Sequence, residues 1–528
     1  MTKGQEESDG PVVPEGRRKA IPTGHRFGGG RGGKGTTASE VVGQLGLFRE
    51  TADSPQGDAE DRDAGGPAPR PRAAPKSRTT TGTFPPAMTM EEIAEENNLR
   101  RAFQQVASNK GAPGPDRQSV VEVREYLDVI LPALHQALLD GSYRPGMIRR
   151  VWIPKSGGGQ RGLGIPNVVD RLVGQAVHQV LSPYFERTFH DSSHGFRPGR
   201  SCHTAIAEAS RHLEEGYEWL VDLDLEKYFD RVHHQRLLAR LEHQGVKDRR
   251  VLQLIRRMLK AKVVMPDGVV VSNEAGVPQG GPLSPLLSNV VLDELDRELE
   301  RRGHRFVRYA DDCNVYVRSR RAGERVMASI TRFIEGRMRL KVNQDKSAVA
   351  RPAQRHFLGF CLQRSQDGSV SVRLSKRSIQ RIRRKIVQLI PRNWGGSLRS
   401  LIERLNEYLE GWIGFFKICS PMEARVGLKI LDSHIRRRLR ALILRQKKRK
   451  LFIIRWLIRK RRVRVRDAMR DVYGGHRSLW ALSITRSAHK AMSSRYFDSL
   501  GLLNVKRRWR QLRPPPVTAP AQLELALG

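Results

Sequence analysis

Two acidic clusters, each lying where a predicted β-strand ends, constrain the fold of this chain more than any other feature. In the first, apolar residues alternate along the strand-like run Trp219–Leu225. Because successive side chains of a strand point to opposite faces, this alternation places Asp222 and Asp224 on the face opposite the apolar residues. The first cluster therefore predicts a strand with one apolar face and one acidic face.

The second cluster lies in a predicted hairpin. Two strand-like runs, His304–Tyr309 and Cys313–Val317, are separated by only three residues, Ala310, Asp311 and Asp312. So short a connection predicts an antiparallel pair with two adjacent aspartates in its turn. Aspartate also favours tight turns, so the hairpin taken alone is equally well explained by turn chemistry.

The two clusters together indicate metal chemistry. Carboxylates that share a partly buried cleft repel one another and lose hydration, and a divalent cation removes that cost. Magnesium takes oxygen ligands and often shares them with substrate phosphates, so aspartates on two strands side by side predict a two-metal site for phosphoryl transfer. One ion would lower the pKa of an attacking 3′-hydroxyl, and the other would hold a triphosphate and stabilise the leaving pyrophosphate.

The charge of the chain indicates a polyanionic partner. Its 528 residues contain 95 Lys and Arg against 55 Asp and Glu, a formal net charge of +40. Such a chain attracts nucleic acid, although ribosomal, membrane-surface and heparin-binding proteins are also basic. The four cysteines form no CxxC pair, which favours a reducing, intracellular setting. We find neither an apolar run near 18 residues nor a secretory signal, and expect a soluble protein.

Composition divides the chain into regions. Residues 1–88 contain 26 Gly or Pro and almost no apolar periodicity, which predicts disorder. Within them, Gly28–Gly35 formally fits the GxGxxG pattern, but no strand precedes it, and we interpret it as a flexible Arg/Gly-rich tract. Folded structure is expected from Met90, with helices and strands as far as about residue 374 and basic amphipathic helices after it.

The acidic clusters resemble two motifs of the reverse transcriptases of group II introns. Tyr309–Asp312 reads YADD, the YxDD box of reverse transcriptases, and Asp224–Asp230 reads DLEKYFD, which is similar to their first palm motif. The matching blocks occur in the same order as in this family, which argues against a chance resemblance. A YADD motif by itself would be weak evidence. The resemblance covers roughly residues 97 to 505.

The resemblance assigns a role to each of these aspartates. The catalytic aspartates would be Asp224, Asp311 and Asp312. They would bind two Mg²⁺ ions, with Mn²⁺ as a substitute, together with the backbone carbonyl of Leu225. Asp222 and Asp230 fall outside this triad, as a strand-edge acid and a structural or capping acid.

Further blocks imply contacts with the incoming nucleotide. In the segment that begins VWIPK and resembles the fingers hairpin, Lys155 and Arg161 would grip the triphosphate, with a plain surface hairpin as the alternative. Phe229 would lie beneath the deoxyribose and reject a 2′-hydroxyl, unless it is only a core aromatic. In VPQGGPLSP, Gln279 would hydrogen-bond to template or nucleotide, and further on Lys346 would protonate the departing pyrophosphate.

Other blocks imply contacts with template and primer. The loop HGFRPGRS would follow the template backbone, with an ordinary Pro/Gly turn as the alternative. The glycines of the PQG motif permit close approach to a base pair, and FLGF resembles the primer-grip hairpin. The residues assigned to template and primer are Arg197, Arg200, Gly280, Phe357, Leu358 and Gly359.

Features outside the palm motifs indicate a group II intron protein. Lys110–Asp116 (KGAPGPD) resembles the family's N-terminal extension, and Gly411–Phe416 (GWIGFF) resembles its maturase thumb, although those aromatics also suit a helix core. Residues 431–470 hold 17 Lys or Arg against two Asp, which predicts a phosphate-binding face rather than an ordinary solvated one. The residues assigned to RNA are Arg436, Arg437, Arg438, Arg440, Lys447, Lys448 and Arg449.

The resemblance also sets expectations about the two ends. Many group II intron proteins end in a zinc-containing HNH endonuclease, but no cysteine follows Cys419 here and no paired Cys/His spacing is present. The ending therefore resembles the class C type, and second-strand cleavage is not predicted. The long N-terminal extension is either lineage-specific or the result of a misassigned start codon.

The predicted fold is an α+β right-hand polymerase with fingers, a palm built on a small antiparallel sheet, and an α-helical thumb. The expected regions are a disordered extension (1–88), the N-terminal extension and fingers (89–215), the palm (216–370), the maturase thumb (371–460), a basic nucleic-acid-binding region (461–510) and a flexible tail (511–528).

By resemblance, the chain is an RNA-directed DNA polymerase that also binds its intron RNA to assist splicing and retrohoming. Its partners would be group II intron RNA, an RNA template with a DNA or RNA primer, target DNA and dNTPs, in the prokaryotic cytoplasm and nucleoid and not at a membrane; a homodimer is left open. One alternative is a domesticated reverse transcriptase in phage defence, DNA repair or a CRISPR locus. Another is a maturase that only binds RNA, which the three aspartates argue against.

Overall fold

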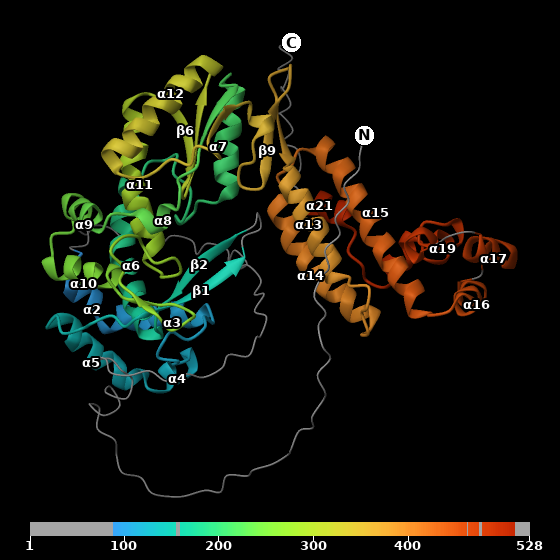
Figure 1. Cartoon of the computed structure of the whole chain (residues 1–528), viewed down its shortest axis with the longest axis horizontal. Coiled ribbons are helices and arrows are strands. Elements are labelled where there is room, and N and C mark those ends of the chain that lie inside the picture. Colours follow the sequence, from blue (N-terminus) through green and yellow to red (C-terminus); the bar gives the residue numbers. More distant parts are fainter. Residues whose placement is uncertain (1–87, 155–158, 462, 475–477, 513–528) are drawn as a thin grey trace, which may run out of the picture.

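A computed structural model describes residues 88–154, 159–461, 463–474 and 478–512 (Figure 1). The disorder predicted for residues 1–88, the Arg/Gly-rich tract within them and most of the tail predicted from residue 511 lie outside the described residues. Two predicted boundaries shift slightly: Met88 is buried, and the last helix continues to Leu512.

Helices open the described chain. They are α2 (Met90–Ala94), α3 (Glu96–Ser108), α4 (Val120–Glu125), α5 (Leu127–Leu139) and, after the first strands, α6 (Val168–Thr188). The hydroxyl of Thr89 accepts a hydrogen bond from the backbone N–H of Glu92 and caps α2. The apolar residues spaced at helical intervals in α3, Leu99, Phe103 and Val106, are buried, so the helix predicted here is confirmed.

The fingers contain a small mixed sheet in the order β2–β1–β4–β5. Its strands are β1 (Ile148–Pro154), β2 (Gln160–Ile165), β4 (Val263–Val264) and β5 (Val270–Val271). β1 and β2 are antiparallel with Val151 opposite Leu163, which confirms the predicted hairpin, and β4 runs parallel to β1. The turn of this hairpin, residues 155–158, lies outside the described residues.

The palm is built on an antiparallel sheet in the order β6–β7–β3–β8, as predicted. Its strands are β3 (Trp219–Leu223), β6 (Arg305–Tyr309), β7 (Asp312–Val317) and β8 (Ala348–Ala350). α7 (Cys202–Glu214) precedes β3, and the helices between the palm strands are α8 (Tyr228–Arg231), α9 (His234–His243), α10 (Arg249–Leu259), α11 (Ser284–Arg301), α12 (Arg320–Arg332) and the π-helical η1 (Phe333–Met338). β3 ends two residues earlier than predicted, and Leu225 retains only an isolated bridge to Val342.

The two faces of the palm sheet belong to different hydrophobic cores. Val221 and Leu223 of β3 pack into the core that contains α11 and α12. Leu220 of the same strand and Tyr316 of β7 pack into the core that contains α7 and the C-terminal helices. The alternation of β3 therefore fixes the sheet between the fingers side and the thumb side of the molecule.

Helices form the C-terminal part of the described chain, as the loss of strand signals predicted. After the 3₁₀ turn η2 (Pro352–Gln354) come β9 (Phe360–Arg364) and β10 (Val370–Leu374), and then α13 (Lys376–Leu389), α14 (Leu398–Phe416), α15 (Pro421–Gln446), α16 (Lys450–Arg461), α17 (Val465–Tyr473), α18 (Leu479–Leu482), α19 (Arg486–Ala491), α20 (Ser494–Ser499) and α21 (Val505–Leu512). Figure 1 shows α16, α17 and α19 at the end of the molecule farthest from the palm. Across the described ranges, no helix is both long enough and apolar enough to cross a membrane.

Candidate active site

The turn between β6 and β7 is tighter than predicted. Tyr309 pairs with Asp312, so only Ala310 and Asp311 form the connection, and Asp312 is the first residue of β7. Ala310 adopts the left-handed conformation, with φ of 55°, which a residue other than glycine adopts only when its surroundings hold it there. We call Ala310 and Asp311 the catalytic turn.

The palm sheet brings the predicted aspartates together. β3 and β7 are antiparallel neighbours with Leu223 opposite Cys313, so Asp224 and Asp312 lie one step further along the same register. The backbone carbonyl of Asp224 accepts a hydrogen bond of 2.8 Å from the N–H of Asn343. Acids separated by almost ninety positions in the sequence therefore share one edge of the sheet.

These carboxylates influence one another's protonation. Burial and the charges of three neighbouring carboxylates raise the pKa of Asp312 to about 7, although part of its side chain is open to solvent. Burial also raises the pKa of Asp311, against the opposing influence of Arg161 and then Arg308. The ammonium of Lys346 lies 3.8 Å from Oδ1 of Asp224 and is the nearby cation that lowers the pKa of Asp312.

The donor set suits a hard divalent cation. Within the described residues, no three His, Cys, Asp or Glu side chains converge closely enough to hold one ion by themselves. Magnesium in nucleotide-dependent enzymes commonly takes only one or two carboxylates, and substrate phosphates and water complete its coordination. Carboxylates that raise one another's pKa form a site whose repulsion a cation relieves, so the residues fit such an ion.

Asp222 has a partner of its own. Its carboxylate accepts a hydrogen bond of 2.6 Å from Nε of Arg355, and Nη2 of Arg355 also donates to the backbone carbonyl of Lys346. Arg355 therefore ties the segment before β9 both to Asp222 of β3 and to the loop that carries Lys346. Its contact with Arg355 gives Asp222 a structural role, and its place outside the triad stays a prediction.

Those residues predicted to contact the nucleotide that the structure describes lie around the same edge of the palm sheet. Arg161 is exposed on β2 and influences the pKa of Asp311, whereas Lys155 lies outside the described residues. Phe229 and Gln279 line a cavity of about 310 Å³ between the fingers sheet and the segment after β5. Phe229 is half-buried and contacts the ring of Tyr228 edge-on. Part of its side chain packs in the core and part is accessible from the cavity, so both interpretations of this residue stay open.

The PQG segment packs directly against the fingers. The backbone N–H of Gly164 donates a hydrogen bond of 2.7 Å to the carbonyl of Gln279. A Cβ at Gly280 would lie 2.5 Å from the carbonyl oxygen of Gly164, and the φ of Gly280 is 119°. Glycine at this position is therefore required by the contact between fingers and palm, whatever else it contacts.

Two relatives and one solved structure are similar to parts of this chain. Protein YkfC of Escherichia coli K12 is 33% identical over 351 residues, which cover 59% of this chain and 90% of YkfC. The group II intron-encoded protein LtrA of Lactococcus lactis subsp. cremoris is 28% identical over 348 residues, which cover 53% of this chain and 57% of LtrA. A solved structure, the partial Cas6-RT-Cas1–Cas2 complex, matches 49% of this chain and 45% of that chain with 23% identity and a TM-score of 0.31, too low to support an argument.

Two family descriptions match consecutive parts of the chain. Residues 153–362 match "Reverse transcriptase (RNA-dependent DNA polymerase)", and residues 379–466 match "Group II intron, maturase-specific domain". This chain belongs to the group II intron reverse transcriptases. Its enzyme class is therefore RNA-directed DNA polymerase, a nucleotidyltransferase, and reverse transcriptase domains use divalent metal ions such as Mg²⁺.

In this reverse transcriptase the structure does not support the predicted contact of Arg197 with template phosphate. The Arg197 side chain is buried, and its Nε donates to both carboxylate oxygens of Glu186 at 2.9 and 3.1 Å. Its Nη1 donates to the backbone carbonyls of His190 and Ser193. Arg200 is more accessible and pairs with the exposed Asp191, so its predicted role stays a prediction.

The segment assigned to the primer grip is a tight turn pressed against the thumb. Phe357 and Phe360 form an isolated bridge, and Leu358 and Gly359 between them have φ of 51° and 95°. A Cβ at Gly359 would lie 3.3 Å from the ring of Phe416 in α14. Phe416 also contacts the ring of Phe360 at 5.1 Å between centroids, so the helix-core interpretation of the thumb aromatics is correct for this residue.

The arginines assigned to RNA on α15 divide into buried and exposed groups. Arg440 is buried, and its guanidinium donates to the backbone carbonyls of Met492 and Ser483, so the structure does not support an RNA contact for it. Burial lowers the pKa of Arg440 to about 10. Arg436, Arg437 and Arg438 are half-buried. The guanidinium of Arg437 stacks on the ring of Trp480. Arg438 donates to the backbone carbonyls of Val387 in α13 and Ile390 directly after it.

The remaining cations assigned to RNA lie near the junction of α15 and α16. Lys448 and Arg449 are exposed there, while Lys447 is half-buried with its ammonium 5.3 Å from the ring centre of Trp456. Fewer of the seven assigned cations are therefore exposed than the sequence suggested. Sequence cannot distinguish the buried from the exposed arginines of one helix when both carry the same charge.

The sequence analysis did not identify one buried residue beside the candidate site. Arg308, directly before the YADD tyrosine, is completely buried and forms an ion pair with Asp296 at 2.6 Å. An arginine in a strand otherwise rich in apolar residues gives no signal of its own, because its partner comes from α11. A buried charge is the feature that would have identified it, and burial is known only from the fold.

Proposed function

We propose that this chain copies RNA into DNA at the palm edge that carries Asp224, Asp311 and Asp312, and that it binds group II intron RNA to assist splicing and retrohoming. The observation that carries the proposal is that these three acids, at the motif positions of a matched reverse transcriptase family, lie at the neighbouring ends of the adjacent strands β3 and β7. The maturase-specific match to residues 379–466 favours an intron-associated role over a domesticated one.

In this proposal the three aspartates hold two Mg²⁺ ions, with the carbonyl of Leu225 as a further ligand. When bound, such ions lower the pKa of an attacking 3′-hydroxyl and stabilise charge on the leaving pyrophosphate. The carboxylates supply the negative charge that binds them. Burial and then neighbouring carboxylates raise the pKa of Asp311 and of Asp312, and this supports the assignment because a bound cation would offset both effects.

The chain's own cations and aromatics then select and orient the nucleotide. Arg161 approaches the acids from the fingers and would bind triphosphate oxygens, and Lys346, beside Asp224, would donate a proton to pyrophosphate. Phe229 and Gln279, which line the same cavity, would contact the sugar and the base pair. Together they favour a deoxynucleotide paired to a template.

Intron binding would use the cationic surface around Lys448 and Arg449. Folded RNA is recognised largely through its backbone and shape, and exposed cations on a rigid helical scaffold suit that recognition. The splicing chemistry would remain with the RNA, since the proposed role of the protein is to stabilise its fold. Because the proposed partners are intron RNA and target DNA, we place this function in the cytoplasm and nucleoid.

Primer extension by the full-length protein on an RNA template, with dNTPs and Mg²⁺, tests the polymerase. Extension by the wild type that disappears in Asp311→Asn/Asp312→Asn is expected, and a folded, RNA-binding wild type without extension would favour the binding-only maturase. A parallel splicing assay with the surrounding intron RNA tests the second activity. The double variant should retain splicing assistance, because the acids are remote from the proposed RNA surface.

A further inference from the structure

We propose that Arg308 is a positioning residue that fixes the catalytic turn and thereby sets the affinity of the active site for its metal ions. The inference deepens the proposed polymerase function and rests on it. Arg308 touches none of the proposed substrates. It acts through the backbone that carries Asp311 and Asp312.

The guanidinium of Arg308 uses all its donor nitrogens inside the palm. Nε and Nη2 donate to the two carboxylate oxygens of Asp296 at 2.7 and 2.6 Å. Nη1 donates to Oδ1 of Asn289 at 3.0 Å and to the carbonyl of Ala310 at 2.9 Å, and Nη2 also donates to Oγ of Ser193 at 2.6 Å. One fully buried side chain therefore joins α11, the loop before α7 and the catalytic turn.

Stability alone does not account for this arrangement. A buried ion pair can often be replaced by apolar residues of similar volume without loss of stability, because removing both charges also removes their desolvation cost. The bond from Nη1 to the carbonyl of Ala310 serves a different purpose. It holds a residue that is already in the unfavourable left-handed conformation, and so it favours one geometry of the turn over relaxed alternatives.

A second set of contacts grips the turn from the loop side. The backbone of Arg308 accepts a hydrogen bond from the N–H of His194 and donates one to the carbonyl of Ser192, each 2.8 Å long. Nδ2 of Asn289, the residue that also accepts from Arg308, donates to the carbonyl of Gly195. A Cβ at Gly195 would lie 2.2 Å from the backbone nitrogen of Ala310, so the loop and the turn are in direct contact.

This clamp bears on metal affinity because the carboxylates project from the clamped backbone. Metal ligands must be held close to their binding geometry by the residues that support them. Lysine keeps the charge of Arg308 but has one nitrogen, which cannot reach Asp296, Asn289 and Ala310 in the same planar arrangement. Arg308→Lys should therefore loosen the turn while keeping the buried charge paired.

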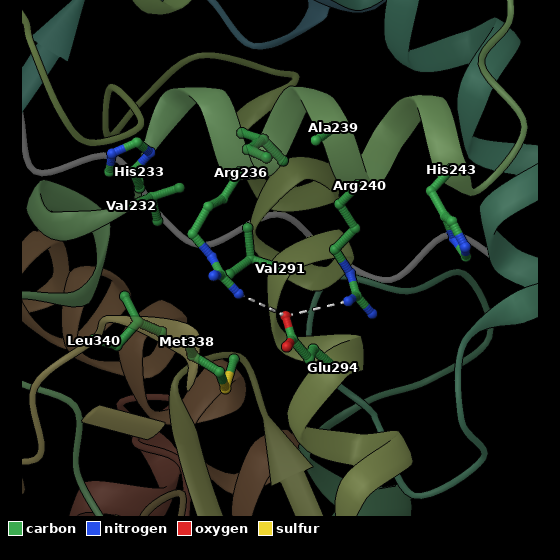
Figure 2. A pocket seen from close by; sticks show the side chains of 11 residues that line it. Val232, His233, Arg236, Ala239, Arg240, His243, Val291, Glu294, Met338 and Leu340 are labelled. Carbon is green, nitrogen blue, oxygen red and sulfur yellow. Dashed lines mark hydrogen bonds and ion pairs between the residues drawn. The ribbon is translucent and has the colours of Figure 1, made fainter. Parts of the chain in front are cut away.

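The test compares Arg308→Lys with Arg240→Lys in the full-length protein. Arg240 is the matched control because it also binds α11, through the carboxylates of Asp293 and Glu294 and the carbonyl of Val290, yet contacts no atom of the catalytic turn. Figure 2 shows Arg240 and Arg236 directed at Glu294 in a cavity of about 320 Å³ between α9 and α11. None of the proposed site residues lines that cavity.

The readouts are the rise in melting temperature as MgCl₂ is added, which reports metal binding without catalysis, and the single-turnover extension rate per active site as MgCl₂ is varied. We expect Arg308→Lys to raise the half-saturating Mg²⁺ concentration roughly tenfold and to lower the maximal rate about 10- to 100-fold, since a displacement near 1 Å can cost that much. The affinity for primer-template should change less than twofold. Arg240→Lys should leave the Mg²⁺ requirement unchanged.

The outcomes separate the two proposals. If the wild type extends primers and Arg308→Lys has fewer active sites but an unchanged Mg²⁺ requirement per site, Arg308 is merely structural and the inference is wrong. If the wild type does not extend primers at all, the polymerase function fails first. Should Arg308→Lys not fold, the double variant Arg308→Met/Asp296→Leu removes both buried charges, and a normal Mg²⁺ requirement in that variant would equally overturn the inference.

Discussion

Asp312 should make metal binding by this reverse transcriptase depend on pH near neutrality. Its pKa is about 7 in the folded protein, because burial and three neighbouring carboxylates disfavour its charged form. A metal ion binds the ionised carboxylate, so the ion and the proton compete. For a pKa of 7, about 9% of the group is ionised at pH 6 and about 91% at pH 8, so the half-saturating Mg²⁺ concentration should fall about tenfold between these values.

Thermal unfolding at pH 6, 7 and 8 over a range of MgCl₂ concentrations measures this effect without relying on catalysis. An ion that binds only the folded protein raises its melting temperature, and the concentration dependence gives the apparent affinity. Asp312→Asn should lose most of the metal-dependent rise and its pH dependence. Asp267→Asn is the control, because Asp267 is an exposed aspartate in the turn between β4 and β5.

The raised pKa of Asp312 also determines how the stability of the folded protein changes with pH when no metal is added. Asp312 has an ordinary pKa of 3.8 in the unfolded chain and about 7 in the folded protein, so between pH 4 and pH 7 the folded state holds a proton that the unfolded state has lost. Stability must then fall as pH rises through that window. A half-saturating Mg²⁺ concentration that is the same at pH 6 and pH 8 would refute the reasoning, as would a pH dependence retained by Asp312→Asn.

Three further predictions follow from the site and the RNA surface. Phe229→Ala should raise incorporation of ribonucleotides relative to deoxynucleotides roughly tenfold or more, measured as the ratio of kcat/KM values, and an unchanged ratio would assign Phe229 to packing alone. Gly195→Ala should lower the extension rate about 100-fold, because the added methyl group displaces the catalytic turn, whereas Gly395→Ala, with open space around the added Cβ, should have no effect. Lys448→Ala/Arg449→Ala should weaken intron RNA binding in filter assays and reduce the salt dependence by roughly two phosphate contacts, with extension on a simple template retained.

Much of the geometry of the candidate site was predictable because local rules determine it. The alternation along β3 and the short connection between β6 and β7 required two strands ending in acids, whichever neighbours they had. The tertiary structure adds that these strands are adjacent and in the register that places Asp224 beside Asp312. The tight turn and the early end of β3 differ from the prediction by only one or two residues, since strand ends depend on partners that sequence does not name.

The sequence does not predict which arginines are buried and which are exposed. Composition correctly indicated an excess of positive charge, but Arg197 and Arg440 are buried against internal acceptors, while Lys448 and Arg449 face solvent. Charge and spacing are properties of the local sequence, whereas burial and hydrogen-bond partners come from segments distant in the chain. The sequence by itself therefore determined the strands, the acids and the chemistry that they favour. Only the tertiary structure decided which cations can reach nucleic acid, and that one of them, Arg308, is instead enclosed behind the catalytic turn.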